Sequence, residues 1–166
     1  MNQSISLQPL RADNEAFSFA VYSSTRTDEL ALLNWDEAQK DAFLRMQFTA
    51  QHKYYQDHFP EASYHIIHCD GRAVGRLYVD RRSDEIRIVD IALLPEYRNG
   101  GIGTTLLQDI LDEGTKARKP VRIHVEKLNP ALDWYERLGF CEVGDTGVYL
   151  LMEWSPNRVE ETPATE

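Results

Sequence analysis

The N-terminal third of the chain changes from a strand pattern to a helix pattern. Apolar and polar residues alternate over residues 5–10, as in a β-strand with one buried face. Apolar residues then recur at helical steps over residues 16–21, after two residues at 13–14 whose side chains can cap a helix. A longer helix is expected from residue 34 or 36 to residue 58, because the periodicity continues until Pro60 stops it. These patterns predict one strand and two helices.

Three apolar segments in close succession predict an antiparallel meander. They cover residues 63–69, 74–80 and 85–94. Short turn signals separate them, Asp70-Gly71 in the first gap and residues 82–84 in the second. Connections this short join antiparallel neighbours, so the three strands should lie side by side in one sheet.

The C-terminal half predicts a helical crossover followed by a strand pair. The expected elements are a helix closed by Gly114 and Pro120, a strand over residues 121–126, a short helix over 130–138, and strands over 140–143 and 148–154. A helix separates the strand over 121–126 from the one over 85–94, so these two strands should run parallel through a right-handed crossover. The predicted class is α/β with a mixed sheet, in which an antiparallel meander precedes a parallel strand pair and helices cover both faces.

Length and composition predict a single domain. The chain has 166 residues, of which 42% are hydrophobic, enough for one buried core over residues 1–154. Residues 155–166 are polar and contain two prolines, so we expect a disordered tail there. No signal peptide or membrane span is apparent, and neither Cys69 nor Cys141 has metal-like or CxxC spacing. A soluble cytoplasmic protein with two buried free thiols is expected.

Charge narrows the classes of partner. The net charge is −9, and no cluster of basic residues is present that could neutralise phosphates. The sequence therefore argues against nucleic-acid and membrane partners and favours a cationic one.

His65 and His68 lie on opposite faces of their strand without a third ligand, so no metal site is predicted. The sequence leaves a homodimer open.

A glycine-rich turn between a strand and an amphipathic helix is the strongest chemical signal. It reads Arg98-Asn-Gly-Gly-Ile-Gly-Thr104. Glycines let the backbone bend tightly, and the N-terminus of the following helix favours negative charge, so the turn can hold a pyrophosphate. A plain helix-initiating turn is the alternative. A dinucleotide-binding turn fits poorly, because Leu106 stands where the third glycine is needed, and the Gly-Lys-Ser/Thr of a nucleotide-binding P-loop is missing.

Two motifs together resemble the GNAT superfamily of N-acetyltransferases. Arg98-x-x-Gly101-x-Gly103, after a strand that ends in residues 91–95, is similar to the acetyl-CoA signature of that family. Asn129-Pro-Ala followed by residues 135–140 is similar to its second motif. The resemblance covers roughly residues 85 to 145. It implies a GNAT fold, acetyl-CoA as cosubstrate, and transfer of an acetyl group to an amine of a small molecule or peptide by direct attack in a ternary complex.

The resemblance also implies a set of residues that bind acetyl-CoA. The strands around Ile91 and His124 would splay apart, and free backbone groups of the first strand would pair with the pantetheine arm. The amide of Ile91 would also stabilise the developing oxyanion. Asn129 would bind the pantetheine arm or fix the turn after its strand. The full set is Ile91, Ala92, Leu93, Arg98, Asn99, Gly100, Gly101, Ile102, Gly103, Thr104, Asn129 and Tyr135.

Two residues are candidates for proton transfer. Tyr135 of the second motif is expected to protonate the departing thiolate, because a phenol with an ordinary pKa of about 10 stays protonated at neutral pH. Its alternative role is to pack the short helix. His124 shares one strand face with Arg122 and Glu126 and is the candidate general base. A solvated His124 is the alternative, with Glu126 or a water chain as the base.

The acceptor side is the least determined part of the sequence. By resemblance it would include residues 22–51 and the loop over 144–147. Arg26 could bind a carboxylate and Glu29 an amine, with Tyr54 nearby, although a solvated loop explains these residues as well. A noncatalytic CoA-binding module is the alternative function, whereas the failed dinucleotide spacing disfavours an oxidoreductase.

Overall fold

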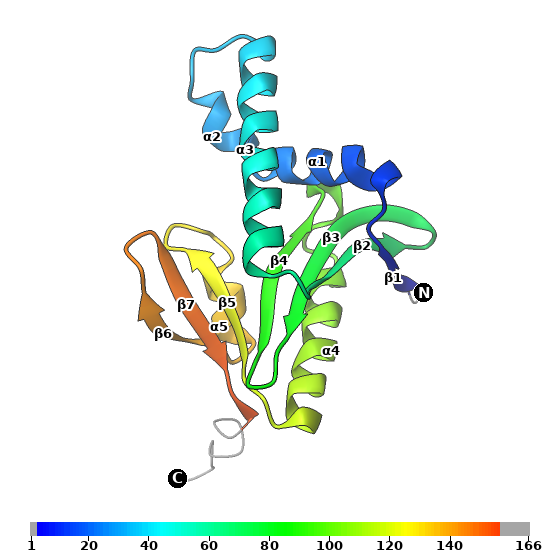
Figure 1. Cartoon of the computed structure of the whole chain (residues 1–166), viewed down its shortest axis with the longest axis vertical. Helices are drawn as coiled ribbons and strands as arrows, with labels where there is room; N and C mark the ends of the chain where they lie inside the picture. Colours follow the sequence, from blue (N-terminus) through cyan, green and yellow to red (C-terminus); the bar gives the residue numbers. More distant parts are fainter. Residues whose placement is uncertain (1–2, 157–166) are drawn as a thin grey trace. The chain divides into compact units, whose positions relative to one another are not determined.

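A mixed seven-stranded sheet organises the protein. The structure is a computed structural model and describes residues 3–156. The strand order is β1-β2-β3-β4-β5-β7-β6, labelled in Figure 1. Strand β4 pairs in parallel with β5, and β5 pairs antiparallel with β7, so the predicted fold class is confirmed. The strands are β1 Ile5–Pro9, β2 Ser63–Cys69, β3 Arg72–Arg81, β4 Ile86–Leu93, β5 Val121–Glu126, β6 Cys141–Asp145 and β7 Tyr149–Trp154.

The helices follow the predicted order with one addition. They are α1 Glu15–Ser24, α2 Thr27–Ala31, α3 Glu37–His58, α4 Ile102–Ala117 and α5 Leu132–Arg137, with 3₁₀ turns η1 Ala12–Asn14 and η2 Pro95–Tyr97. Helix α2 lies where the sequence suggested a polar loop. Helix α3 begins where predicted, because the Asp36 side chain accepts a hydrogen bond of 2.8 Å from the backbone N–H of Gln39, whose own side chain caps Asp36 in return.

The prediction that Gly114 closes helix α4 was wrong, because the helix continues to Ala117. A Cβ at Gly114 would lie 2.9 Å from the carbonyl oxygen of Lys119 and 3.0 Å from the ring of Trp154. Glycine is therefore required here by close packing rather than by a helix end. A Cβ at Gly139 would also lie 3.1 Å from the Trp154 ring.

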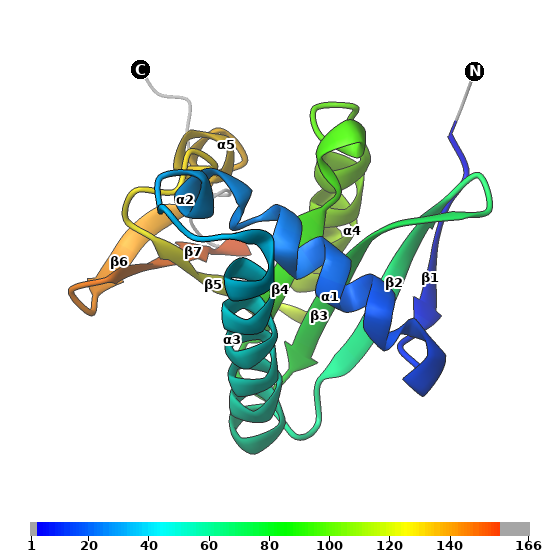
Figure 2. The same cartoon turned by 90° about the horizontal axis from the view of Figure 1, so that it is seen from above.

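The chain divides into two compact units, each described here by itself. The first contains residues up to Tyr78 and Asp90–Gly103, and the second contains Val79–Val89 and the residues from Thr104 onward. In the first unit α1 crosses α3 (Figure 2), and the rings of Phe19 and Phe48 meet edge to face at 5.4 Å. Buried residues of this core include Val21, Tyr22, Ile66 and Tyr78.

The second unit has its core between α4 and the strands β5 and β7. Its buried residues include Leu107, Ile110, Leu111, Val121, Ile123, Val125, Met152 and Trp154. Strand β7 lies between β5 and β6, and pairs with both. Along β5 the apolar residues are buried and alternate with more exposed polar ones, which confirms the predicted alternation.

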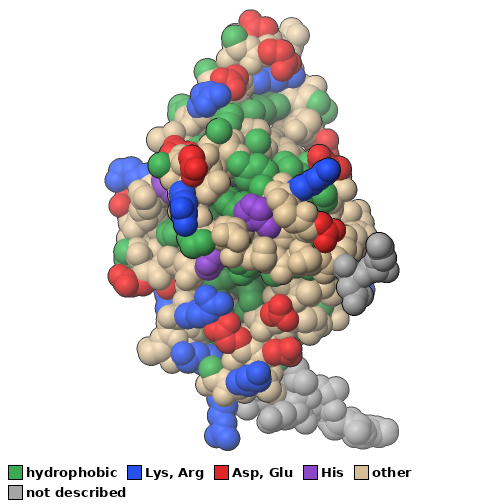
Figure 3. Space-filling model, turned by 90° about the vertical axis from the view of Figure 1, so that its right-hand side faces the viewer, with side chains coloured by type: hydrophobic (Ala, Val, Ile, Leu, Met, Phe, Trp, Pro, Cys, Tyr) green, Lys and Arg blue, Asp and Glu red, His purple; other side chains and the backbone are tan. Residues whose placement is uncertain are grey.

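The surface carries charges of both signs. On the face drawn in Figure 3, basic and acidic side chains are interspersed rather than gathered by sign. Within residues 3–156, no helix is long and apolar enough to cross a membrane. Both cysteines are free thiols, as predicted, but only Cys69 is buried and Cys141 is half-buried in β6. Most of the predicted polar tail, from residue 157 onward, lies outside the described residues.

Candidate functional site

The glycine-rich turn joins β4 to α4 through a left-handed backbone. Residues Pro95–Tyr97 form the 3₁₀ turn η2, after which Asn99 has a φ of 64° and Gly101 a φ of 90°. Asparagine tolerates this conformation better than most residues, and glycine adopts it without steric cost. Helix α4 begins at Ile102, so its first N–H groups, which have no carbonyl partner within the helix, directly follow the turn.

Arg98 holds the turn against the end of β4. Its Nε donates a hydrogen bond of 3.0 Å to the carbonyl oxygen of Leu93, and its Nη2 lies 3.4 Å from the hydroxyl of Ser24 in α1. The guanidinium therefore braces the strand end and the turn together. The carbonyl oxygen of Leu93, predicted to be available to a ligand, accepts this hydrogen bond on one of its two lone pairs.

Strand β3 approaches the end of β4 unusually closely at Gly75. A Cβ at this position would overlap the carbonyl oxygen of Ala92 and would lie 2.8 Å from Cδ2 of Leu93. Any side chain here would displace the strand segment expected to pair with the pantetheine arm. The β4–β5 ladder pairs only Ile86–Ile88 with Val121–Ile123. The splay expected farther along, at Ile91 and His124, stays a prediction.

A buried ionic cluster lies beneath this segment, in the first unit. Arg76 on β3, 2% exposed, donates hydrogen bonds of 2.5 Å to Asp90 of β4, 2.8 Å to Gln51 of α3 and 3.1 Å to Ser18 of α1. The hydroxyl of Tyr55 donates to the same oxygen of Asp90 at 3.1 Å. Burial and the charge of Asp90 raise the pKa of Tyr55, so its phenol stays protonated. Asp90 is therefore in a buried polar contact that fixes β4 to β3 and α3.

The second motif forms α5 and the turn before it. Tyr135 is only 5% exposed and packs its ring against Trp134 at 4.9 Å and Phe140 at 5.6 Å. The packing role considered for this residue is thus present, and its role as proton donor stays a prediction. Asn129 fixes the preceding turn, because its Oδ1 accepts a hydrogen bond of 2.8 Å from the N–H of Ala131.

His124 lies on the polar face of β5 beside an arginine. Nη1 of Arg87 is 3.5 Å from its Nδ1. A guanidinium can only donate, so in the neutral ring Nδ1 accepts and the proton lies on Nε2. Burial lowers the pKa of His124, and the positive charge of Arg87 lowers it further, so the imidazole is neutral at pH 7.

Arg87 belongs to an ionic network that the sequence analysis missed. Glu85, 4% exposed, contacts Arg87 at 3.2 Å, Arg122 at 2.9 Å and Arg82 at 3.2 Å. Burial alone would raise the pKa of Glu85, but hydrogen bonds from Arg122 and the charge of Arg87 hold it below its ordinary value. Glu85 thus stays ionised and fixes Arg87 next to His124.

The two sequence motifs and the mixed sheet agree with a match between this chain and a model of a known protein family. A model of the acetyltransferase (GNAT) family matches residues 28–140. The chain belongs to the GNAT acetyltransferase family. It is therefore an acyl-CoA-dependent N-acetyltransferase, with acetyl-CoA as its acetyl donor. No curated protein matches it significantly in a direct comparison.

Solved structures share the fold of this GNAT enzyme. PaiA N-acetyltransferase from Thermoplasma acidophilum, in complex with coenzyme A, is 18% identical, with 92% of this chain and 99% of that chain covered at a TM-score of 0.68. The ribosomal-protein-S18-alanine N-acetyltransferase from Escherichia coli is 17% identical, with 98% and 100% covered at 0.61. A spermidine N-acetyltransferase chimera from Vibrio cholerae is 17% identical, with 95% and 98% covered at 0.62. At such low identity the likeness establishes the fold and leaves the acceptor open.

The residues predicted for the acceptor side of the GNAT enzyme each have partners in the structure, and their role toward an acceptor stays a prediction. Arg26 and Glu29 pair with each other at 2.8 Å, and Arg26 also lies over the ring of Tyr22. Tyr54 stands in the C-terminal half of α3, where its ring stacks on His58 at 4.0 Å. The charges of Arg26 and Glu29 are already matched without a ligand. A zwitterionic acceptor would therefore have to break this pair.

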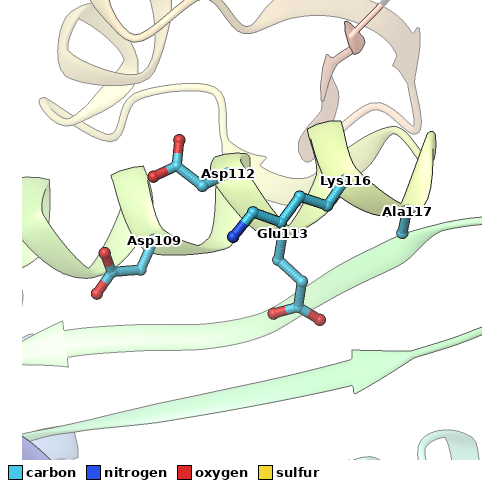
Figure 4. Close-up of a pocket in the computed structure, with 5 residues that line it drawn as sticks. All are labelled: Asp109, Asp112, Glu113, Lys116 and Ala117. Atoms are coloured by element: carbon cyan, nitrogen blue, oxygen red, sulfur yellow. The ribbon is translucent and has the colours of Figure 1, made fainter.

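A shallow depression on α4 does not include any predicted site residue. Asp109, Asp112, Glu113, Lys116 and Ala117 line it, as Figure 4 shows. Its charged side chains come from consecutive turns of one helix, and Glu113 is held by Arg81 of β3. The depression therefore has the character of a solvated helix face.

Proposed function

We propose that this GNAT enzyme transfers the acetyl group of acetyl-CoA directly to a primary amine of a small molecule or peptide in a ternary complex. The amine nitrogen attacks the thioester carbonyl carbon, the new C–N bond forms, and the C–S bond breaks with release of the CoA thiolate. A neutral amine loses one proton as the amide forms and the thiolate gains one, whereas an acceptor that arrives as ammonium first loses another proton, which leaves to solvent. Neither cysteine belongs to the two motifs, which favours direct transfer over an acyl-enzyme.

The observation that carries the proposal is the left-handed turn at the N-terminus of α4. Positive φ angles at Asn99 and Gly101 bring the backbone into the first turn of the helix. Backbone N–H groups and the helix dipole there favour a pyrophosphate. In this proposal the N–H of Ile91 hydrogen-bonds the thioester oxygen as negative charge develops on it. The contact of Arg98 with Leu93 keeps the turn attached to that strand.

Two side chains transfer protons in the proposed reaction, one as a general acid and one as a general base. Tyr135 protonates the departing thiolate through its hydroxyl. His124 takes the proton of the acceptor ammonium, which its neutral state allows. Because Nδ1 faces Arg87, this step requires that the 3.5 Å contact open to admit the acceptor or a bridging water.

Replacing Gly101 with valine should weaken binding of acetyl-CoA by about 10- to 100-fold, because the left-handed backbone and its charge-assisted hydrogen bonds are lost. Isothermal calorimetry would measure the effect. Gly71→Val is the matched control, since Gly71 has a similar φ of 83° and, like Gly101, open space around it, but lies in the β2–β3 turn. Equal affinity of the Gly101 variant and the wild type would remove the turn from the site.

Replacing Arg87 with methionine should raise the pKa of His124 from its depressed value, because a nearby positive charge is removed while the Glu85 carboxylate remains. If His124 is the base, activity requires its neutral form, so the acidic limb of the pH–rate profile should move to higher pH in the variant. NMR titration of the His124 ring would measure the same shift independently of activity. A shifted ring pKa with an unmoved rate profile would assign the base to Glu126 or water.

The acceptor can be found by screening amines while free thiol is monitored. Polyamines and alanine-containing peptides are the first probes, because two fold neighbours are named for spermidine and for an alanine of a ribosomal protein. The net charge of −9 favours polyamines as acceptors, because they are cationic. Binding of CoA without transfer to either class of probe would point to an acceptor amine of another class.

A further inference from the structure

The indole of Trp134 is tied to the first turn of helix α4. Its Nε1–H donates a hydrogen bond of 2.9 Å to Oγ1 of Thr104. Thr104 is the third residue of α4 and directly follows Gly103 of the turn. Trp134 lies in α5, immediately before Tyr135. The contact therefore joins the helix that follows the first motif to the helix that carries the second.

This contact excludes the indole as an acceptor for the Thr104 hydroxyl proton. A helical threonine divides between two rotamers, one of which lets its hydroxyl bond back to a carbonyl of the preceding turn. Thr115, near the other end of α4, shows that arrangement, because its Oγ1 donates to the carbonyl of Leu111 at 3.1 Å. At Thr104 the oxygen accepts from the indole N–H on one of its two lone pairs. The hydroxyl proton must then point toward a different acceptor, since an indole N–H cannot accept.

We propose that Trp134 is a positioning residue for acetyl-CoA, which orients the Thr104 hydroxyl as a hydrogen-bond donor to a phosphate oxygen of the cofactor. The inference rests on the proposed binding of acetyl-CoA at the turn. It adds Trp134, which the sequence analysis did not single out and whose effect on the cofactor would run through Thr104. An oxygen that accepts from the indole also becomes a stronger donor, because hydrogen bonds in a chain polarise one another.

The test compares variants that remove one group each. Thr104→Val removes the hydroxyl and keeps the shape, while Trp134→Phe removes the N–H and keeps an aromatic ring. Calorimetry with CoA should show affinity reduced about 10-fold or more by Thr104→Val and about 3-fold by Trp134→Phe, because a hydrogen bond to a charged phosphate is lost in one case and misoriented in the other. The double variant should bind like Thr104→Val alone. In kinetics, KM for acetyl-CoA should rise with kcat unchanged.

A phosphate-free donor separates this role from support of the fold. The kcat/KM for S-acetylpantetheine should be the same in the wild type and in both variants, and Thr115→Val should keep the CoA affinity of the wild type. Equal losses with both donors, additive losses in the double variant, or an unchanged CoA affinity of Trp134→Phe would each overturn the inference. Failure of the wild type to bind CoA would instead remove the proposed function on which it rests.

Discussion

Replacing Tyr135 with phenylalanine should lower turnover at saturating substrates by about 10²- to 10⁴-fold, the range typical of a lost general acid. The ring contacts with Trp134 and Phe140 do not need the hydroxyl, so the fold should survive and acetyl-CoA should still bind. Steady-state kinetics together with calorimetry would separate the two effects.

A second tyrosine provides the control for this experiment. The hydroxyl of Tyr64 donates to the carbonyl of Phe59 at 3.0 Å, so Tyr64→Phe also removes a hydrogen-bonded phenol but has no proposed part in the reaction. Its turnover should stay close to that of the wild type. If Tyr135→Phe lost only affinity for acetyl-CoA, the hydroxyl would be a binding group, and an unchanged turnover would leave packing as its whole role.

Replacing Arg76 with methionine should lower the free energy of unfolding by about 3–5 kcal/mol, because Asp90 would keep a buried charge without its partner. Urea denaturation would measure the loss. Arg81→Met is the matched control, since Arg81 pairs with Glu113 but the two side chains keep 44% and 38% of their exposure, and a pair near the surface contributes about 0–1 kcal/mol.

Neutralising both partners of the buried pair should recover part of the loss. In the double variant Arg76→Met with Asp90→Asn no charge is left buried, so its free energy of unfolding should exceed that of the single Arg76 variant. A single variant no less stable than the Arg81 control would mean that Asp90 is solvated or protonated once Arg76 is gone.

Most of the fold was predictable because its signals are local. The strands β2, β3 and β4 are apolar segments between short turns, and the capping pair at the start of α3 is visible in the sequence. Helix α2 has only five residues, too few for a periodic apolar face, so it was missed. Gly114 misled the prediction of the end of α4 because its packing partner Trp154 is distant in sequence.

The candidate site was predictable only where it depends on consecutive residues. The turn over residues 98–104 and the motif around Tyr135 are local patterns. The Arg76–Asp90 pair left a signal only as charged residues within largely apolar strand segments, and Ser18 and Gln51 gave none. The contacts of Arg87 with His124 and of Trp134 with Thr104 depend on how distant segments pack, which periodicity does not contain.

The position of β7 constrains the order in which the second unit can be completed during synthesis. Strand β6 emerges from the ribosome first, yet in the sheet it is joined to β5 only through β7. Trp154, the last residue of β7, also fills the space beside Gly114 and Gly139. Until this last strand has been translated, β6 has no place in the sheet, and α4 lacks the ring that packs against it. A nascent chain that ends before β7 therefore exposes the apolar faces of β5 and α4, the kind of surface that makes folding intermediates prone to aggregate.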